Sequence, residues 1–226
     1  MPNSSLRIRW AWSFAKSVRV EFALVAEGPS DHALLRPLRD LCLQCGVSEA
    51  LGSAPDLRRL PSPIGARVAD KLRAVTKLLP DVDLYLVHRD ADTRDPAPRY
   101  REIEAAANEV SEDLSWVGVV PVRETEAWAL LDERAIRAVA ENPHGRNRLG
   151  LPGARAVERL ADPKRRLDDA IVRASELNGR RLREFRRTLP WRRSLLLERI
   201  DLDGAIRQVP AWQRLHRELR AAIWRL

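Results

Sequence analysis

Residues 18–31, VRVEFALVAEGPSD, constrain the fold of this chain more than any other stretch. Their apolar run stops abruptly at Glu27, and leucines then recur at helical spacing. The pattern predicts a buried strand over 18–26, a tight turn and a helix over 30–44. Glu27 therefore follows the carboxyl end of a strand, where open α/β sheets bind ligands, and Asp31 can point the same way one helical turn later.

Two further apolar runs, over 83–88 and 115–122, also predict buried strands. Apolar residues at helical spacing predict helices over 64–79 and 99–113. Residues 46–62, rich in Gly, Ser and Pro, predict a loop with at most one short strand. Because strands alternate with helices, we expect an α/β fold with a mainly parallel sheet flanked by helices.

The length of 226 residues suits one domain with a substantial appendage. After residue 133 the pattern is helical to the end of the chain. We therefore expect a core over 1–133 and a basic helical extension over 134–226 that packs on this core. Within the core, residues 1–17 suit either a short edge strand or a disordered leader.

Positive charge is concentrated toward the C-terminus. Residues 164–226 hold 17 Lys/Arg and 8 Asp/Glu, whereas residues 1–163 hold 23 Lys/Arg and 24 Asp/Glu. This distribution favours a polyanionic partner, and we expect nucleic acid, with DNA favoured over RNA. The ratio of 36 Arg to 4 Lys also fits a compositional bias of the genome, so the arginines are not individually assigned to phosphates.

No apolar run approaches the roughly 18–20 residues that a membrane helix needs. The N-terminus contains basic residues and tryptophans but no signal-peptide core. We therefore expect a cytoplasmic protein without a membrane partner.

Cys42 and Cys45 form a C-x-x-C motif, which is a weak signal for a redox pair or for half of a zinc site. The sequence has no second Cys pair and no His pair at metal-ligand spacing. The favoured interpretation is that Cys42 packs as a small apolar residue at the end of the first helix.

Acidic residues follow all three predicted strands: Glu27 and Asp31, Asp90 and Asp92, and Glu124 and Glu126. Because the carboxyl ends of parallel strands meet at one edge, we expect these carboxylates to lie close together. Clustered carboxylates raise one another's pKa unless a cation compensates, and Mg²⁺ prefers oxygen ligands. Two such ions, roughly 3.5–4 Å apart, activate water and stabilise a leaving oxygen on phosphate. Any single one of these residues could instead cap a helix or lie in solvent.

The strand that runs into Glu27-Gly28 and the later strand that runs into Asp90-Ala91-Asp92 resemble the Toprim domain. Topoisomerases, bacterial primases and the nucleases of the overcoming-lysogenization-defect (OLD) family share this fold. The resemblance implies that Glu27 acts as a general acid/base or binds metal, and that Asp90 and Asp92 bind metal. Asp31 resembles the extra acidic residue that OLD-type nucleases use for a second metal.

The chain also resembles small stand-alone Toprim-like proteins of uncharacterised function, often encoded in bacterial defence or mobile loci. The shared features are an E-x-E-A-W segment, here Glu124–Trp128, a P-K pair, here Pro163-Lys164, and a final segment similar to 201–219. The resemblance covers about residues 18–220 and implies a role in phage defence.

The resemblance implies a nuclease that depends on Mg²⁺ or Mn²⁺. The principal metal would be held by Glu27, Asp90 and Asp92, and a second metal by Asp31, Glu124 and Glu126. Lys164 would neutralise charge that develops on the scissile phosphate, although an ordinary surface lysine is the more common interpretation. No Walker loop, G-x-x-x-x-G-K-[ST], occurs, so an ATPase partner would be a separate chain.

Two other functions stay open: a nucleic-acid-binding module without catalysis, and an effector subunit that acts only with a partner ATPase. A homodimer is compatible with each of them. Topoisomerase activity is not expected, because neither Tyr85 nor Tyr100 lies in the context of a catalytic tyrosine.

Several residues near the motifs have two interpretations. His88 could reach the phosphate, but an inward-facing strand histidine is more often a core residue. Arg89 and Arg94 could contact phosphate or could balance the nearby acids. Five tryptophans are expected to pack in the core, namely Trp116, Trp128, Trp191, Trp212 and Trp224, and Trp191 is the candidate for base stacking.

Overall fold

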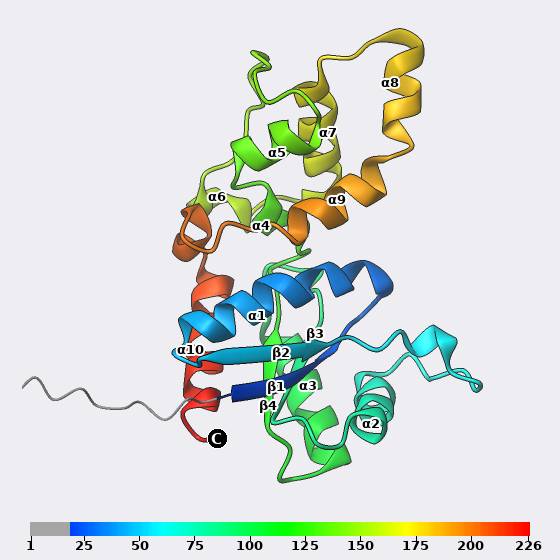
Figure 1. The fold of residues 1–226 in the computed structure, drawn as a ribbon, viewed down its shortest axis with the longest axis vertical. Coiled ribbons are helices and arrows are strands. Elements are labelled where there is room, and N and C mark those ends of the chain that lie inside the picture. The colour runs from blue at the N-terminus through cyan, green and yellow to red at the C-terminus, as the bar shows by residue number, and fades with distance from the viewer. Residues whose placement is uncertain (1–18) are drawn as a thin grey trace, which may run out of the picture.

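The computed structural model describes residues 19–226, and its centre is a four-stranded parallel sheet with strand order β2-β1-β3-β4 (Figure 1). The strands are β1 (Arg19–Val25), β2 (Glu49–Ser53), β3 (Leu84–His88) and β4 (Trp116–Val119). The α/β class, the parallel sheet and its helical flanks are therefore confirmed. The residues of the possible leader, 1–17, lie outside the described part of the chain.

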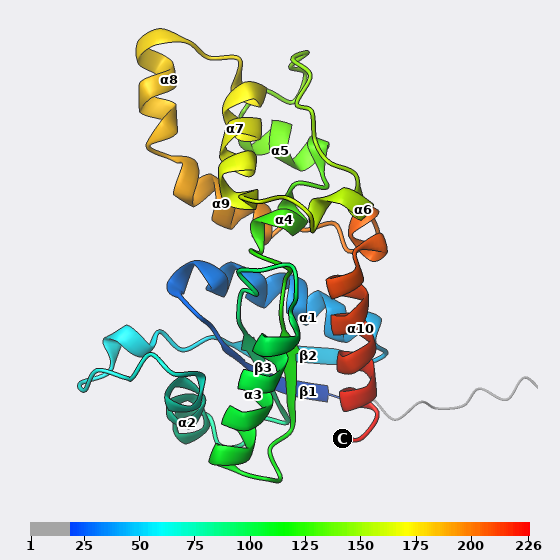
Figure 2. The same ribbon diagram turned by 180° about the vertical axis from the view of Figure 1, so that it is seen from behind.

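The sheet is covered on both faces, which explains why its central strands are apolar runs rather than alternating patterns. Helices α2 (Val68–Leu78) and α3 (Ala97–Val110) pack on one face, where β1 contributes Ala23 and Val25. Helices α1 (Leu35–Gln44) and α10 (Pro210–Ile223) pack in the cluster that β1 joins with its alternate residues (Figures 1 and 2).

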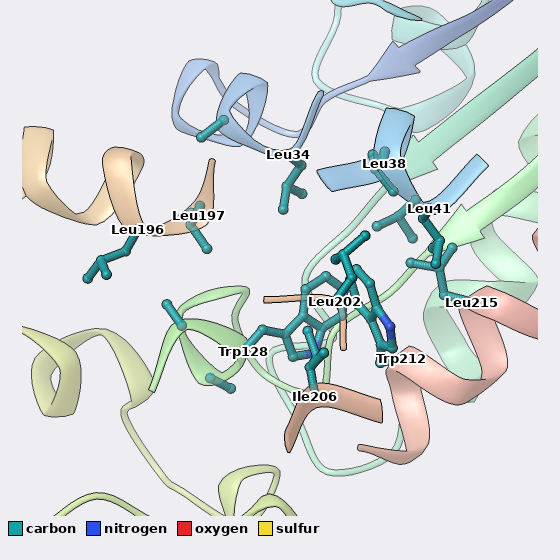
Figure 3. Packing of buried hydrophobic residues seen from close by; sticks show 14 of the residues in the cluster. Leu34, Leu38, Leu41, Trp128, Leu196, Leu197, Leu202, Ile206, Trp212 and Leu215 are labelled. Atoms are coloured by element: carbon teal, nitrogen blue, oxygen red, sulfur yellow. The ribbon is translucent and has the colours of Figure 1, made fainter. Parts of the chain in front are cut away.

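The remaining helices follow the carboxyl end of β4 and stack beyond that edge of the sheet (Figure 2). They are α4 (Glu126–Ala129), α5 (Glu133–Val139), α6 (Ala154–Val157), α7 (Pro163–Ser175), α8 (Gly179–Arg186) and α9 (Leu189–Leu197). Short 3₁₀ helices are η1 (Pro29–Leu34), η2 (Leu57–Arg59) and η3 (Ala205–Gln208). Trp128 of α4 and Trp212 of α10 are buried and meet edge to face, with ring centroids 5.0 Å apart (Figure 3). This contact ties the helical cluster to the helix that returns along the sheet.

The element boundaries differ from the predictions in a few places. The helix predicted over 64–79 begins only at Val68, and the segment 46–62 contains the one short strand that was allowed for it, β2. The strand predicted over 115–122 ends at Val119. Cys42 and Cys45 are free and buried, in agreement with the packing interpretation. Among residues 19–226, no helix has the length and apolar character that crossing a membrane requires.

Gly52 of β2 pairs with Phe22 of β1, and the ring of Phe22 crosses the position that a side chain would take. A Cβ atom at Gly52 would lie 2.3 Å from the Phe22 Cζ. Since Phe22 is fully buried, we expect Gly52→Ala to lower the free energy of unfolding by about 1–3 kcal/mol. Urea denaturation measures this loss. The control is Gly153→Ala, where a Cβ meets no atom within 4 Å, and an equal loss in both variants would contradict the packing argument.

Candidate functional site

The carboxyl ends of β1, β3 and β4 lie side by side. Val25 of β1 is paired with Val87 of β3, so the turn after β1 lies next to the loop after β3. Backbone pairing continues past the end of β3, where the Ala91 N–H donates to the Pro121 carbonyl at 3.1 Å and the Asp92 N–H to the Arg123 carbonyl at 3.2 Å. The acidic segments that follow the three strands are thus brought to one edge, as the sequence predicts.

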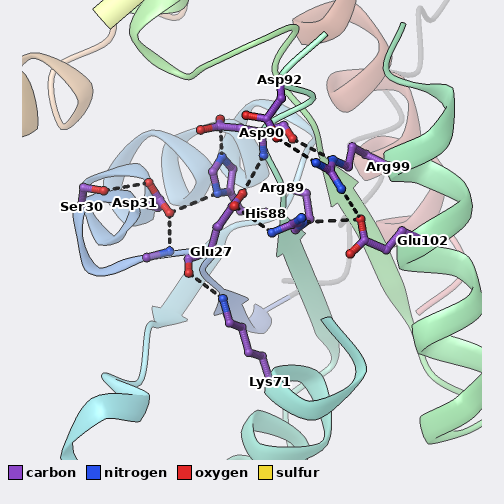
Figure 4. Close-up of polar contacts among 11 residues, drawn as sticks. Glu27, Ser30, Asp31, Lys71, His88, Arg89, Asp90, Asp92, Arg99 and Glu102 are labelled. Atoms are coloured by element: carbon purple, nitrogen blue, oxygen red, sulfur yellow. Dashed lines mark hydrogen bonds and ion pairs between the residues drawn. The ribbon is translucent and has the colours of Figure 1, made fainter. Parts of the chain in front are cut away.

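Glu27 contacts the Asp90 segment directly (Figure 4). One oxygen of its carboxylate accepts the Asp90 backbone N–H at 3.0 Å, and the other lies 2.7 Å from the Arg89 guanidinium. The Glu27 carbonyl accepts a hydrogen bond from the Lys71 ammonium at 2.6 Å. Glu27 is therefore held beside Asp90 by contacts from the segment after β3 and from α2.

Asp31 is fixed by the turn that precedes it. Its Oδ2 accepts the Gly28 N–H at 2.7 Å, and its Oδ1 accepts the Ser30 hydroxyl at 3.1 Å. The residue is buried and faces His88 across the strand ends. Burial opposes ionisation of this carboxyl, but His88 and the Gly28 amide outweigh it, so the pKa of Asp31 is lowered.

His88, the last residue of β3, lies between two carboxylates. Its Nδ1 is 3.3 Å from Asp31 and its Nε2 is 3.4 Å from Asp90. The alignment is too poor for hydrogen bonds, so the contacts are ionic. Burial alone lowers the pKa of His88, but the two flanking carboxylates outweigh it and raise this pKa to about 9. The histidine is buried, as expected for a core residue, yet it is also the charged centre of the site.

Asp90 and Asp92 have different environments. Asp90 Oδ1 is buried and has no hydrogen-bond partner among the described residues. The carboxylate of Asp92 is 60% exposed and is held 2.8 Å from Arg99, which also contacts Glu102 at 2.8 Å (Figure 4). The structure therefore directs Asp92 toward α3 rather than toward Glu27.

The segment after β4 supplies the remaining predicted residues. Glu124 accepts the backbone N–H of Lys164 at 3.0 Å, so the P-K pair meets the E-x-E segment through its backbone. Glu126 is 3.6 Å from Arg193. Burial raises the pKa of Glu126, and the negative charges of Glu124 and Asp90 raise it further. The side chain of Glu126 thus lies within electrostatic reach of the Asp90 loop.

We call the residues Glu27, Asp31, Asp90, Glu124 and Glu126 the carboxylate edge. Their oxygen atoms suit Mg²⁺ or Mn²⁺, and Asp90 Oδ1 accepts no hydrogen bond, although it lies 3.4 Å from His88 Nε2. Within residues 19–226, however, no three acidic, His or Cys side chains already converge on one point as metal ligands. Protein cations hold the carboxylates instead, so metal binding requires Glu27 to exchange Arg89 for the ion.

A basic surface lies on α8 and the turn that follows it. We define the α8 basic surface as Arg181, Arg183, Arg186 and Arg187, which are exposed and form no ion pair with any residue of 19–226. In Figures 1 and 2, α8 projects on the same side of the molecule as the turn from β1 into α1. The surface therefore lies on the side where the first strand ends.

The tryptophan predictions are partly wrong. Trp128 and Trp212 are buried, but Trp224 is 76% exposed and Trp191, next to the α8 basic surface, is 59% exposed. Arg192 is stacked beneath the Trp191 ring at 5.6 Å and over Phe185 at 4.2 Å. The exposed ring of Trp191 remains available as a base-stacking surface.

Sequence reasoning missed three residues that contact the site: Lys71, Arg99 and Glu102. Arg99 and Glu102 are three residues apart on α3, and this spacing was the only signal for a shared face. No protein-family model, curated protein or solved structure matches this chain.

Proposed function

We propose that the chain is a Mg²⁺- or Mn²⁺-dependent phosphodiester hydrolase that acts on nucleic acid, as the resemblance to Toprim and OLD-type nucleases implies. The observation that carries the proposal is the contact between Glu27 and Asp90, residues 63 apart in sequence, beside a buried Asp90 oxygen that forms no hydrogen bond and has only its ionic contact with His88. A buried carboxylate oxygen that accepts no hydrogen bond is a candidate ligand for a bound ion. A separate ATPase partner and a role in phage defence are further expectations from the same resemblance.

A bound divalent ion supplies a Lewis acid and lowers the pKa of a coordinated water. Glu27 and Asp90 would hold the principal ion, with Asp92 joining them once Arg99 releases it. Asp31 and the carboxylates after β4 would support a second ion. Residues of the chain provide the surrounding charge: His88 holds Asp31 and Asp90 apart, and Lys164 lies at the start of α7 beside Glu124.

The α8 basic surface supports nucleic acid as the substrate class. Its four guanidinium groups have no acidic partner among the described residues, and several uncompensated arginines together favour a polyanion over a single anion. Guanidinium groups bind phosphate oxygens in bidentate geometry. We therefore propose that this surface binds the part of the nucleic-acid strand that lies outside the cleavage site.

Removing two arginines of this surface should reduce the salt dependence of binding. For Arg183→Ala/Arg187→Ala, we expect the slope of log K against log salt for duplex DNA to become less negative by about 1.8, because each phosphate contact contributes about −0.9. Fluorescence anisotropy at several salt concentrations measures the slope. The matched control is Arg217→Ala/Arg225→Ala, which removes two exposed arginines at α10. Equal slopes for the two double variants would contradict the assignment.

A second candidate function is nucleic-acid binding without catalysis. It is favoured by the protein cations that already neutralise Glu27, Asp31 and Asp90, since such a network is stable without metal. The two functions differ in a cleavage assay. The proposed hydrolase should nick or degrade plasmid DNA with Mn²⁺ or Mg²⁺ and not in EDTA. Binding without cleavage under either metal would favour the second candidate.

A further inference from the structure

A cavity of about 450 Å³ lies directly beside Glu27. It is lined by the turn into η1, by the segment 55–65 and by α2. Its volume falls within the range of small-molecule sites, which are typically about 300–1,000 Å³ and mainly apolar with a few polar groups. None of the predicted roles of the carboxylate edge uses this cavity.

The walls of the cavity are mainly apolar. Its apolar lining consists of Leu57, Leu60, Ile64 and Val75 together with several prolines. Prolines and branched aliphatic side chains form rigid surfaces against which a flat ring can pack. The cavity therefore favours a ligand with a planar, weakly polar body over an extended charged one.

Charge in the cavity is almost fully compensated. Glu27 pairs with Arg89, and Asp56 pairs with Arg58 at 2.9 Å. Lys71 is different, because it forms no ion pair with any residue of 19–226 and donates only to the Glu27 carbonyl. Its ammonium is thus an uncompensated positive charge in the lining of the cavity, and Figure 4 shows it directed at Glu27.

We propose that this cavity binds a nucleoside phosphate, with the base against the apolar walls and the phosphate at Lys71. The inference rests on the proposed function, because the phosphate would then lie next to Glu27 at the carboxylate edge. A base in a duplex is paired and stacked, so it must leave the helix before it can enter such a cavity. The cavity therefore selects an unpaired nucleotide, at a strand end or in a single strand.

The test measures binding to the metal-free protein, so it does not depend on cleavage. Isothermal titration calorimetry in EDTA would use thymidine 5′-monophosphate, a single-stranded dT₈ and a blunt duplex of eight base pairs. We expect saturable binding of the mononucleotide and of dT₈. Leu60→Trp, which fills the cavity, should weaken both by at least about tenfold. Leu78→Trp places the same ring at an exposed position of α2 outside the cavity and should bind as the wild type does.

Lys71→Ala provides a second variant that leaves the apolar walls intact. It should weaken binding of thymidine 5′-monophosphate but not of thymidine, whereas Lys77→Ala on the same helix should change neither. Thermal denaturation of each variant checks that it is folded. Tighter binding of dT₈ than of the mononucleotide identifies a strand as the ligand, and the opposite order identifies a free nucleotide.

Two results would overturn the proposal: no saturable binding of either ligand by the folded wild type, or equal binding by wild type and Leu60→Trp. Either result can be distinguished from a failure of the proposed hydrolase function, which is measured by cleavage. An enzyme that requires Asp90 but cleaves equally well with Leu60→Trp keeps the proposed function and loses the cavity assignment. Nucleotide binding that requires Leu60 and Lys71, in a protein that cleaves nothing, gives the reverse outcome.

Discussion

Replacing Asp90 by asparagine should abolish cleavage of nucleic acid, lowering its rate by roughly 10³-fold or more. Asn keeps the shape of the side chain but removes the negative charge that would hold the principal ion. A metal ion contributes several kcal/mol of transition-state stabilisation, and each 1.36 kcal/mol corresponds to a tenfold change in rate. The measurement is the initial rate of plasmid nicking at saturating Mn²⁺.

The matched control for this variant is Asp113→Asn, which makes the same change at an exposed residue after α3. It should nick plasmid at the wild-type rate. If the wild type cleaves and Asp90→Asn retains that activity, or if cleavage persists in EDTA, the carboxylate edge is not the catalytic site. The double variant Glu27→Ala/Asp90→Ala extends the test to both residues that meet across the strand ends.

Replacing His88 by leucine should strongly destabilise the metal-free protein. Leucine fills the space of the buried imidazole but removes the cation between Asp31 and Asp90. The two carboxylates then face each other without a compensating charge. Removing one partner of a buried ion pair typically costs about 3–5 kcal/mol. Urea denaturation at pH 6 in EDTA measures the loss. His144→Leu, at an exposed position, should cost far less, and equal losses would show that His88 carries no special charge role.

The stability provided by His88 should also depend on pH in a defined direction. The pKa of His88 is raised in the folded protein from 6.5 to about 9, so the folded state holds the proton more tightly than the unfolded chain does. The stabilisation is complete below pH 6.5 and is lost as pH rises through about 9. The difference in unfolding free energy between wild type and His88→Leu should therefore narrow across that interval. A difference that widens would contradict a protonated His88.

The strands and their acidic ends could be predicted because both are encoded locally. A short apolar run that stops at a charged residue specifies the strand and the place where it ends, as at Val25 and His88. Parallel pairing then requires the strand ends to share an edge, and this conclusion needs no information about side-chain contacts. This is why the meeting of Glu27 with Asp90 follows from the sequence alone.

The side-chain pairs at that edge could not be predicted, because they depend on register and on local backbone conformation. His88 meets Asp31 only because Val25 pairs with Val87, and the sequence does not state that register. Asp92 has a left-handed backbone, with φ 57°, and its carboxylate turns to Arg99. The i, i+2 spacing of the Asp-x-Asp motif contains no information about that turn.

Crystals of the protein soaked in Mn²⁺ test the proposed metal site most directly. The expected result is an anomalous peak at about 2.1 Å from carboxylate oxygens of both Glu27 and Asp90, with the Arg89 guanidinium displaced from Glu27. Diffraction data that show Glu27 still bound to Arg89 and no peak at the carboxylate edge, at saturating Mn²⁺, would contradict metal-dependent hydrolysis at this site.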